Sequence, residues 1–284
     1  METQEIDVQI SKNQIAIDFD ALDQVQTEEE SAVLPSSLVN AKNFEWVGEE
    51  VLFLLVRTHD NPFAKVDLCG KNMEEWVLLA SSGCESRVIE DGENILSSIK
   101  AVQTNKRYIA VFYSDTPLVG KVLFQNIMDY FTRNGLNALT LPRGYVFRRD
   151  YLLSMNDYIA PCVHQFDEVA FTPISNARAL AGAYKILQDK IRAYHVKNGV
   201  VLIGENTISI DCDVEIESGV VIYGGNSLKG STVVGRGVVL REGNYICDSI
   251  ISDGCELTGC YISASKIERD KRLAFEKIEN SNLG

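Results

Sequence analysis

The most constraining feature of this sequence is a ladder of aliphatic residues at every sixth position in its carboxyl-terminal third. The seven members follow one another without a gap: Ile210, Ile216, Ile222, Leu228, Val234, Leu240 and Ile246. An α-helix has a period near 3.6 and an ordinary strand a period of two, so neither produces a period of six. A coil with three flat faces does, because each face takes one hexad and each ladder residue points towards the axis.

A second set of positions supports the same coil. Four residues after each ladder position the side chain is small or carries an amide, which suits a cramped interior corner. These residues are Val214, Val220, Asn226, Thr232, Val238 and Asn244. The hexapeptide repeat therefore predicts a short left-handed parallel β-helix over residues 196–263, with about four coils of three hexads each.

Between residues 48 and 172, apolar runs of strand length alternate with segments of helical spacing. Such alternation indicates a mainly parallel sheet with helices on its faces. The predicted strands are VLFLLV (51–56), RYIAVFY (107–113), GYVF (144–147) and EVAF (168–171), and the predicted helices span 72–82 and 118–133.

The remaining segments connect or flank these two domains. An amphipathic helix is predicted over 173–195, where Leu187 and Ile191 share a face, and it should cover the open end of the first coil. Residues 1–47 form an acidic extension whose alternating apolar positions predict a small hairpin. The hexad pattern fades after Ile262, so we expect residues 264–284 to form a charged helical tail.

Composition excludes some classes of partner. The formal net charge of −13 argues against nucleic acid, because phosphate binding needs clustered Lys and Arg. No apolar stretch is long enough to span a membrane, and the first ten residues do not resemble a secretory signal. The seven cysteines lack paired CxxC spacing, so we expect reduced thiols and a cytoplasmic location.

The order of an α/β domain, a connecting helix and a hexad ladder resembles a known bacterial family. It is the bifunctional N-acetylglucosamine-1-phosphate uridyltransferase/glucosamine-1-phosphate acetyltransferase. The likeness is clearest in ISNARALAGAYKILQDKI and DVEIESGVVIYGGNSLKGSTVVG, within residues 173–263, and patchier in FYSDTPLV (112–119) and AKVDLCGKNM (64–73). The resemblance implies a nucleotidyltransferase-like, Rossmann-like domain over 48–172 that binds a nucleotide or UDP-sugar. Because such β-helical prisms commonly associate side by side, a homotrimer is expected.

The same resemblance implies a magnesium and phosphate site. Asp115 matches the family's carboxylate ligand for Mg²⁺, and Tyr113 lines the same strand end. The family's second ligand, an asparagine, falls on Ser175, so the adjacent Asn176 is the candidate. Arg57 and Lys65 are the candidate phosphate contacts. The residues alone offer another interpretation, in which Asp115 caps a helix whose first residue pair is Thr-Pro.

Three departures from the family pattern argue against catalysis. The family follows its first strand with G-x-G-T-R-M and a Pro-Lys, whereas RTHDNPFAKV here contains no glycine. The stretch NGLNALTLPRGYVF is too short for the family's sugar pocket, so no sugar contacts are assigned. The acetyltransferase histidine lies in later coils, but His59, His164 and His195 all precede the ladder, so acetyl transfer is not expected.

Three functions therefore stay open, and no residue is assigned a catalytic role. The favoured hypothesis is a degenerate, non-catalytic relative connected with UDP-N-acetylglucosamine synthesis, with a binding or scaffolding role. One alternative is an active Mg²⁺-dependent sugar-1-phosphate nucleotidyltransferase of the UDP-N-acetylglucosamine pyrophosphorylase type, with an atypical nucleotide loop. Another is a purely architectural, trimerising protein.

Overall fold

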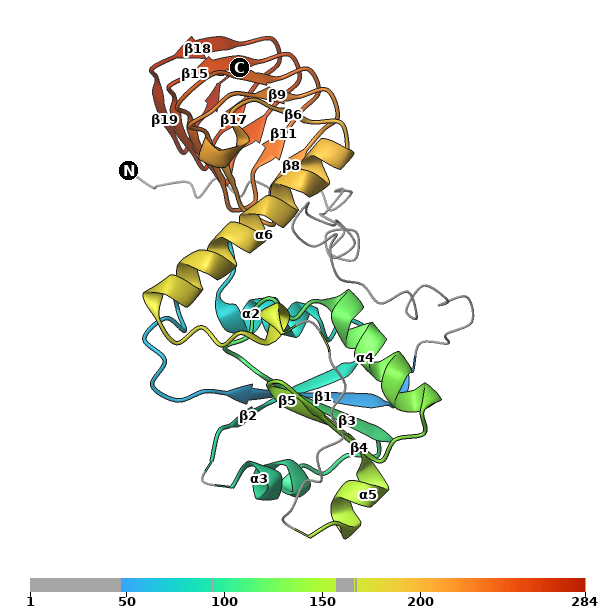
Figure 1. Ribbon diagram of the computed structural model, residues 1–284. Helices are drawn as coiled ribbons and strands as arrows, with labels where there is room; N and C mark the ends of the chain where they lie inside the picture. Colours follow the sequence, from blue (N-terminus) through green and yellow to red (C-terminus); the bar gives the residue numbers. More distant parts are fainter. Residues whose placement is uncertain (1–46, 93, 157–165, 167, 284) are drawn as a thin grey trace, which may run out of the picture. The chain divides into compact units, whose positions relative to one another are not determined.

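The computed structural model describes residues 47–92, 94–156, 166 and 168–283. The chain forms two compact units, which divide near residue 187 (Figure 1). The hairpin predicted within residues 1–47 and the histidine at 164 lie outside the described residues. Within the described ranges, none of the helices combines the length and hydropathy needed to cross a bilayer.

The first unit is built on one five-stranded sheet, in which three parallel strands lie beside an antiparallel hairpin. Its strands, in spatial order, are β2 (Glu85–Glu90), β1 (Val51–Arg57), β3 (Tyr108–Tyr113), β5 (Gly144–Arg148) and β4 (Ala138–Leu141). Strands β2, β1 and β3 are parallel, whereas β5 runs antiparallel to both β3 and β4. The apolar runs predicted as buried strands form β1 and β3, at the centre of the sheet.

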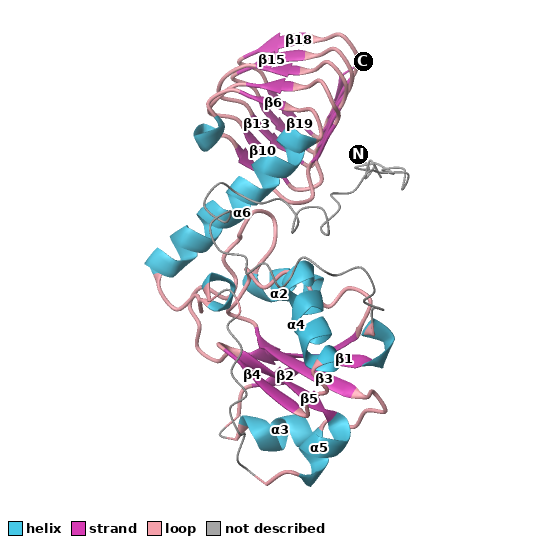
Figure 2. Ribbon diagram, turned by 45° about the vertical axis from the view of Figure 1, so that its right-hand side comes forward, coloured by secondary structure: helices cyan, strands magenta, loops and turns pink. Residues whose placement is uncertain are grey.

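Helices cover both faces of this sheet (Figure 2). On one face lie α2 (Met73–Leu79) and α4 (Lys121–Arg133), and on the other lie α3 (Ile95–Ala101) and α5 (Arg149–Ser154). Alternate residues of β1 enter the two cores, so that Phe53 packs with Phe112 and Phe124 while Leu52 and Leu54 face α3. The helices predicted over 72–82 and 118–133 correspond to α2 and α4.

The strand predicted over residues 168–171 is wrong. Val169–Phe171 form a 3₁₀ helix, in which amides bond to carbonyls three residues earlier. Ala170 and Phe171 are buried, while Val169 is exposed. The Phe171 ring packs against Phe112 instead.

The connecting helix α6 spans Ala177–Lys197, close to the 173–195 that the sequence predicts. Its carboxyl-terminal part belongs to the second unit and bonds to the backbone there. Gln188 donates to the carbonyl of Ile210 (2.7 Å) and accepts from the Ile210 amide (3.0 Å), and Arg192 donates to the carbonyl of Ile208 (3.0 Å). This helix end therefore satisfies backbone groups at the open edge of the first coil.

The second unit is a parallel β-helix of about five turns, consistent with the predicted left-handed β-helix. Its walls are three parallel sheets, each with five short strands. One holds β6, β9, β12, β15 and β18, the second holds β7, β10, β13, β16 and β19, and the third holds β8, β11, β14, β17 and β20. The first five strands are β6 (Val201–Leu202), β7 (Ser209–Ile210), β8 (Glu215–Ile216), β9 (Val221–Ile222) and β10 (Ser227–Lys229). The next five are β11 (Val233–Val234), β12 (Val239–Leu240), β13 (Tyr245–Cys247), β14 (Ile250–Ile251) and β15 (Glu256–Thr258). The last five are β16 (Tyr261–Ser263), β17 (Lys266–Ile267), β18 (Arg272–Ala274), β19 (Lys277–Glu279) and β20 (Asn282–Leu283).

Two predictions for this unit are wrong. The coils number about five rather than four, and residues 264–283 continue the β-helix instead of forming a helical tail. Ile262 pairs with Ile278 and Ile267 pairs with Leu283, sixteen residues apart, whereas Ile210 pairs with Leu228 eighteen residues apart. The later coils are therefore shorter.

The coils shorten because several sides change from six residues to five. On each five-residue side, the second residue after the inward aliphatic one adopts the left-handed conformation and turns the corner early. These corner residues are Asp248 (φ 46°), Gly259 (φ 59°), Ala264 (φ 45°), Phe275 (φ 57°) and Asn280 (φ 48°). The inward aliphatic series then continues beyond Ile246 at steps of five or six, which a search for strict hexads misses.

Candidate functional site

The candidate site lies where the parallel strands β1 and β3 end. Open α/β sheets bind ligands at the carboxyl ends of their parallel strands. Arg57 is the last residue of β1, Tyr113 is the last of β3, and Asp115 follows two residues later. The structure thus places three of the predicted site residues at adjacent strand ends.

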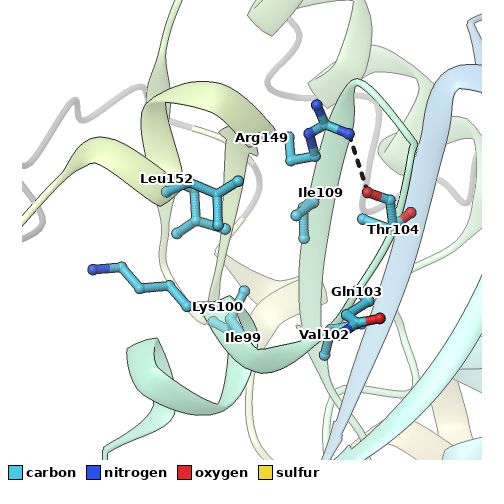
Figure 3. Close-up of a pocket in the computed structure, with 9 residues that line it drawn as sticks. Ile99, Lys100, Val102, Gln103, Thr104, Ile109, Arg149 and Leu152 are labelled. Carbon is cyan, nitrogen blue, oxygen red and sulfur yellow. Dashed lines mark hydrogen bonds between the residues drawn. The ribbon is translucent and has the colours of Figure 1, made fainter.

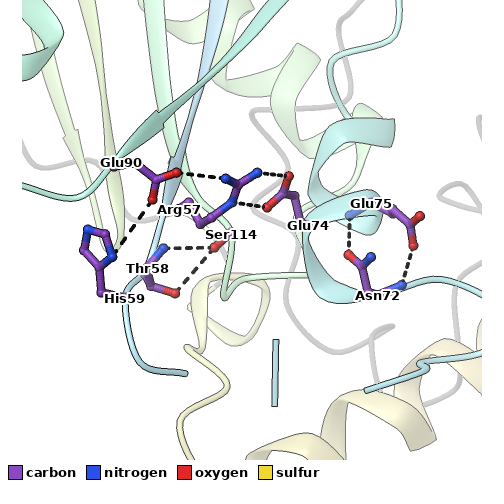
Figure 4. Close-up of polar contacts among 8 residues, drawn as sticks. All are labelled: Arg57, Thr58, His59, Asn72, Glu74, Glu75, Glu90 and Ser114. Atoms are coloured by element: carbon purple, nitrogen blue, oxygen red, sulfur yellow. Dashed lines mark hydrogen bonds and ion pairs between the residues drawn. The ribbon is translucent and has the colours of Figure 1, made fainter. Parts of the chain in front are cut away.

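Arg57 is held by two carboxylates (Figure 4). Its Nε and Nη2 atoms donate to the two carboxylate oxygens of Glu74, each at 2.8 Å, and Nη1 donates to Glu90 at 2.8 Å. Glu74 lies in the first turn of α2, and Glu90 is the last residue of β2. The hydrogen bond from Arg57 lowers the pKa of Glu74. The predicted phosphate contact is therefore already engaged by acidic side chains.

The loop after β1 uses many of its own amides, which a phosphate cradle would need. The Thr58 amide donates to Ser114 Oγ at 3.2 Å, and the Phe63 amide donates to Asn61 Oδ1 at 2.9 Å. The amides of Ala64 and Val66 donate to carbonyls within the loop. Asn61 Nδ2 also donates to the carbonyl of Ile174 at 2.8 Å, tying the loop to the segment before α6. These backbone donors face protein acceptors rather than a ligand.

Asp115 forms a two-pronged ion pair with Arg143. Arg143 Nε donates to Oδ1 at 2.7 Å and Nη2 donates to Oδ2 at 2.6 Å. The side chain of Asp115 is only 8% exposed, and that of Arg143 is 30% exposed. The guanidinium group also lies over the Tyr113 ring, 4.3 Å from its centroid. Both oxygens of the predicted metal ligand therefore have a cationic partner within the protein.

The β-sheet register brings Arg143 to this position. Arg143 belongs to the two-residue turn between β4 and β5, and the next residue, Gly144, pairs with Phe112 of β3. A Cβ atom on Gly144 would lie 2.3 Å from the carbonyl oxygen of Val111, so only glycine allows this close approach. Arg143 is not among the site residues that the sequence predicts. The sequence shows an Arg-Gly pair that suits a hairpin turn. It does not show that Arg143 pairs with Asp115, because that contact depends on the register of β5 on β3.

Tyr113 is half-buried beside this ion pair. Desolvation, with smaller contributions from Tyr145 and Asp91, raises the pKa of Tyr113 to about 12. Its hydroxyl therefore stays protonated near neutral pH and can act as a hydrogen-bond donor. The residues Tyr113, Asp115 and Arg143 form one cluster of ring, carboxylate and guanidinium.

The other two predicted site residues do not join this cluster. Asn176 is exposed, and its Oδ1 accepts the Ala179 amide at 3.0 Å, so it caps the start of α6. Lys65 is exposed and has no ion pair within the described part of the chain. The segment before α6 contacts Asp115 through its backbone, because the Ile174 amide donates to the carbonyl of Asp115 at 2.8 Å.

The helix-cap interpretation of Asp115 is wrong. Helix α4 begins at Lys121 with Gly120 as its N-cap, while residues 114–118 form turns. Among the described residues, no group of three or more His, Cys, Asp or Glu side chains is arranged to hold a metal ion. The guanidinium charge of Arg143 beside both oxygens of Asp115 disfavours a second cation there, and Asn176 uses its Oδ1 to cap α6, so these two side chains do not fit a magnesium site.

A pocket of about 260 Å³ lies near the opposite end of β3 (Figure 3). Ile99, Ile109 and Leu152 contribute apolar walls. Its two cations have backbone partners, since Lys100 donates to the carbonyl of Met155 at 2.7 Å and Arg149 to that of Thr104 at 3.1 Å. The candidate site at the carboxyl ends of β1 and β3 therefore has the stronger arrangement of functional groups.

The chain is similar in sequence to known proteins. No family model matches the chain. It is 35% identical to the bifunctional protein GlmU of Clostridium kluyveri over 267 aligned residues, covering 70% of this chain and 59% of that protein. The chain is a distant, partial relative of GlmU. It is 28% identical to GlmU of Streptococcus thermophilus over 247 residues, covering 82% of this chain and 46% of that protein.

A shorter region is more similar. The chain is 40% identical to GlmU of Clostridium acetobutylicum over 102 residues, which cover 35% of this chain and 22% of that protein. The chain spans about half the length of the curated GlmU relatives that it matches over most of its own length. The α/β unit followed by a parallel β-helix agrees with this kinship.

Proposed function

We propose that this chain is a GlmU-related protein whose α/β unit does not catalyse nucleotidyl transfer and instead has a binding or scaffolding role. Kinship with GlmU supports a function related to nucleotidyl or acetyl transfer in UDP-N-acetylglucosamine synthesis. The observation that carries the non-catalytic proposal is the ion pair between Asp115 and Arg143.

The energy of this pair supports the proposal. Nucleotidyl transfer displaces pyrophosphate, and a divalent cation neutralises the charge that develops on the leaving group. To bind such a cation, Asp115 would have to release Arg143 from a site where the carboxylate is 8% exposed. Losing the two charge-assisted hydrogen bonds from Arg143 costs about 3 kcal/mol. That cost weakens metal binding by roughly a hundredfold.

The loop after β1 gives independent support. A nucleotide triphosphate is held chiefly by backbone amides that point inwards, as in glycine-rich phosphate loops. Here the amides of Thr58, Phe63, Ala64 and Val66 already have protein acceptors. Arg57, the nearest predicted cation, is shared between Glu74 and Glu90.

A turnover assay tests the proposal. The intact chain is mixed with UTP, N-acetylglucosamine 1-phosphate and Mg²⁺, and pyrophosphate release is followed with a coupled enzyme. We expect no release above a protein-free blank. Release by the wild-type chain that is abolished by Asp115→Asn would refute the proposal and establish the active nucleotidyltransferase instead.

We further propose that the β-helix assembles as a homotrimer. The outward positions of β6, β9 and β12 carry Val201, Val221 and Val239, and Val201 is 49% exposed. An apolar stripe along one flat face favours lateral association. Light scattering after gel filtration should give three times the chain mass, and Val221→Glu should reduce it. Ile250→Glu, on a different sheet, is the matched control and should leave the mass unchanged.

A further inference from the structure

The cluster of Tyr113, Asp115 and Arg143 contains a cation where a magnesium site was expected. Asp115 binds the Nε and Nη2 edge of the guanidinium group, and the Tyr113 ring supports one of its faces. The third nitrogen, Nη1, makes no hydrogen bond within the described ranges. With 30% of its side chain exposed, Arg143 has donors that a ligand in solution can approach.

We propose that Arg143 is a built-in cation that takes the place of a divalent metal, so that a diphosphate-bearing ligand binds this edge of the sheet without metal. The inference rests on the proposed function, and it gives the proposed binding role a chemical class of ligand.

Three features suit Arg143 to this task. Its guanidinium group stays charged at any physiological pH and presents several donors in one plane, which matches phosphate oxygens. Asp115 and Tyr113 fix the plane from two directions, so a ligand would meet a preorganised donor.

The same geometry disfavours a divalent cation. A metal at Asp115 would compete with a guanidinium group that already donates to both carboxylate oxygens. It would also lie close to that group's positive charge. Asn176 provides no compensating ligand, because its carbonyl oxygen caps α6. This cluster therefore disfavours a second cation.

Isothermal titration calorimetry on the intact chain tests the proposal, with inorganic pyrophosphate and UDP as probes. Each is titrated once in EDTA and once in excess MgCl₂. We expect binding in EDTA, with a Kd that Mg²⁺ does not improve. Binding that appears only with Mg²⁺, or no binding of either probe in EDTA, overturns the proposal.

Two variants separate the roles of the paired residues. Arg143→Met removes the charge and should weaken binding of both probes by roughly tenfold to a hundredfold, since a hydrogen bond to a charged group is lost. It also frees Asp115, so electron paramagnetic resonance should detect Mn²⁺ binding that the wild-type chain lacks. Equal Mn²⁺ binding by the wild-type chain would contradict the proposal.

The double variant Arg143→Met/Asp115→Asn guards against misfolding. It leaves no unpaired buried charge, so it should fold and bind neither Mn²⁺ nor the phosphate probes. If it binds pyrophosphate as tightly as the wild-type chain does, the anion site lies elsewhere and the proposal fails. The turnover assay is a separate test, because loss of anion binding leaves a non-catalytic scaffold intact, whereas pyrophosphate release refutes the proposed function.

Discussion

Asn244 donates a 2.9 Å hydrogen bond from Nδ2 to Oδ1 of Asn226, one coil earlier in the interior of the β-helix. Asn226 in turn donates to the carbonyl of Arg241 at 2.8 Å, and Asn244 accepts the Cys260 amide at 2.9 Å. Both asparagines are 1% exposed. The two amides therefore satisfy buried backbone groups that a turning coil would otherwise leave without partners.

Replacing Asn244 with leucine should destabilise the β-helix strongly. The two side chains have similar volumes, but the change leaves the Cys260 amide without its acceptor. It also removes the 2.9 Å bond to Asn226 Oδ1, which keeps only the 3.3 Å bond from the backbone amide of residue 244. The expected loss is about 3 kcal/mol in the free energy of unfolding, measured by urea denaturation followed by circular dichroism. Glu242→Leu, an exposed change at the same corner, should shift the midpoint little. Equal effects of the two changes would contradict the role assigned to the hydrogen-bonded pair of Asn226 and Asn244.

At the left-handed corners of the later coils, a change to glycine should stabilise the β-helix. Ala264 is exposed and adopts φ 45°, where a Cβ atom costs energy. Ala264→Gly should therefore increase the free energy of unfolding by about 0.5–1 kcal/mol. Ala274 is also exposed but lies in β18, so Ala274→Gly should destabilise by a similar amount. A destabilising Ala264→Gly would show that the corner is not strained.

The β-helix was predictable from its aliphatic ladder, but its length was not. Ladder residues such as Ile216 and Leu228 occupy equivalent positions on the walls of successive coils, and such a repeat is visible in the sequence. The five-residue sides depend on left-handed corners at Ala264 and Phe275, residue types that rarely adopt this conformation. The sequence therefore concealed the last coils, and a charged helix was the natural misinterpretation of residues 264–284.

The candidate site was predictable in its location and not in its pairing. Strand ends follow from apolar runs, and the structure has Arg57 and Tyr113 as the last residues of the neighbouring strands β1 and β3. Whether Asp115 is available depends on Arg143, which reaches it only because β5 pairs with β3 in one register. That register is set by the close approach at Gly144, a tertiary contact with no local pattern in the sequence.

Gly144 should be the residue whose substitution most directly disrupts this arrangement. Alanine there would place a Cβ atom 2.3 Å from the Val111 carbonyl oxygen at φ 142°. We expect Gly144→Ala to destabilise the α/β unit by at least about 2 kcal/mol, because the backbone of β3 or β5 must move. Thermal unfolding by calorimetry measures the change.

Gly182→Ala is the matched control for that experiment. Gly182 lies in α6, and an added Cβ atom would meet nothing within 4 Å. Alanine in an open helical position should raise stability by up to about 1 kcal/mol. If both substitutions lower the melting temperature equally, the close approach at Gly144 does not constrain the sheet.

His195 should make the stability of the β-helix unit fall below pH 6.5. It is 2% exposed near the end of α6, and its Nε2 atom has no hydrogen-bond partner in the described part of the chain. Burial lowers its pKa from 6.5 to about 4. Between these values the unfolded chain binds a proton that the folded chain does not, so acid favours unfolding. The stabilising contribution of the neutral imidazole is full above pH 6.5 and is lost as the pH falls towards 4, by about 3 kcal/mol in total. Urea midpoints measured from pH 4 to 7 should fall less steeply for His195→Leu, and parallel curves for the two proteins would mean that His195 is not buried in its neutral form.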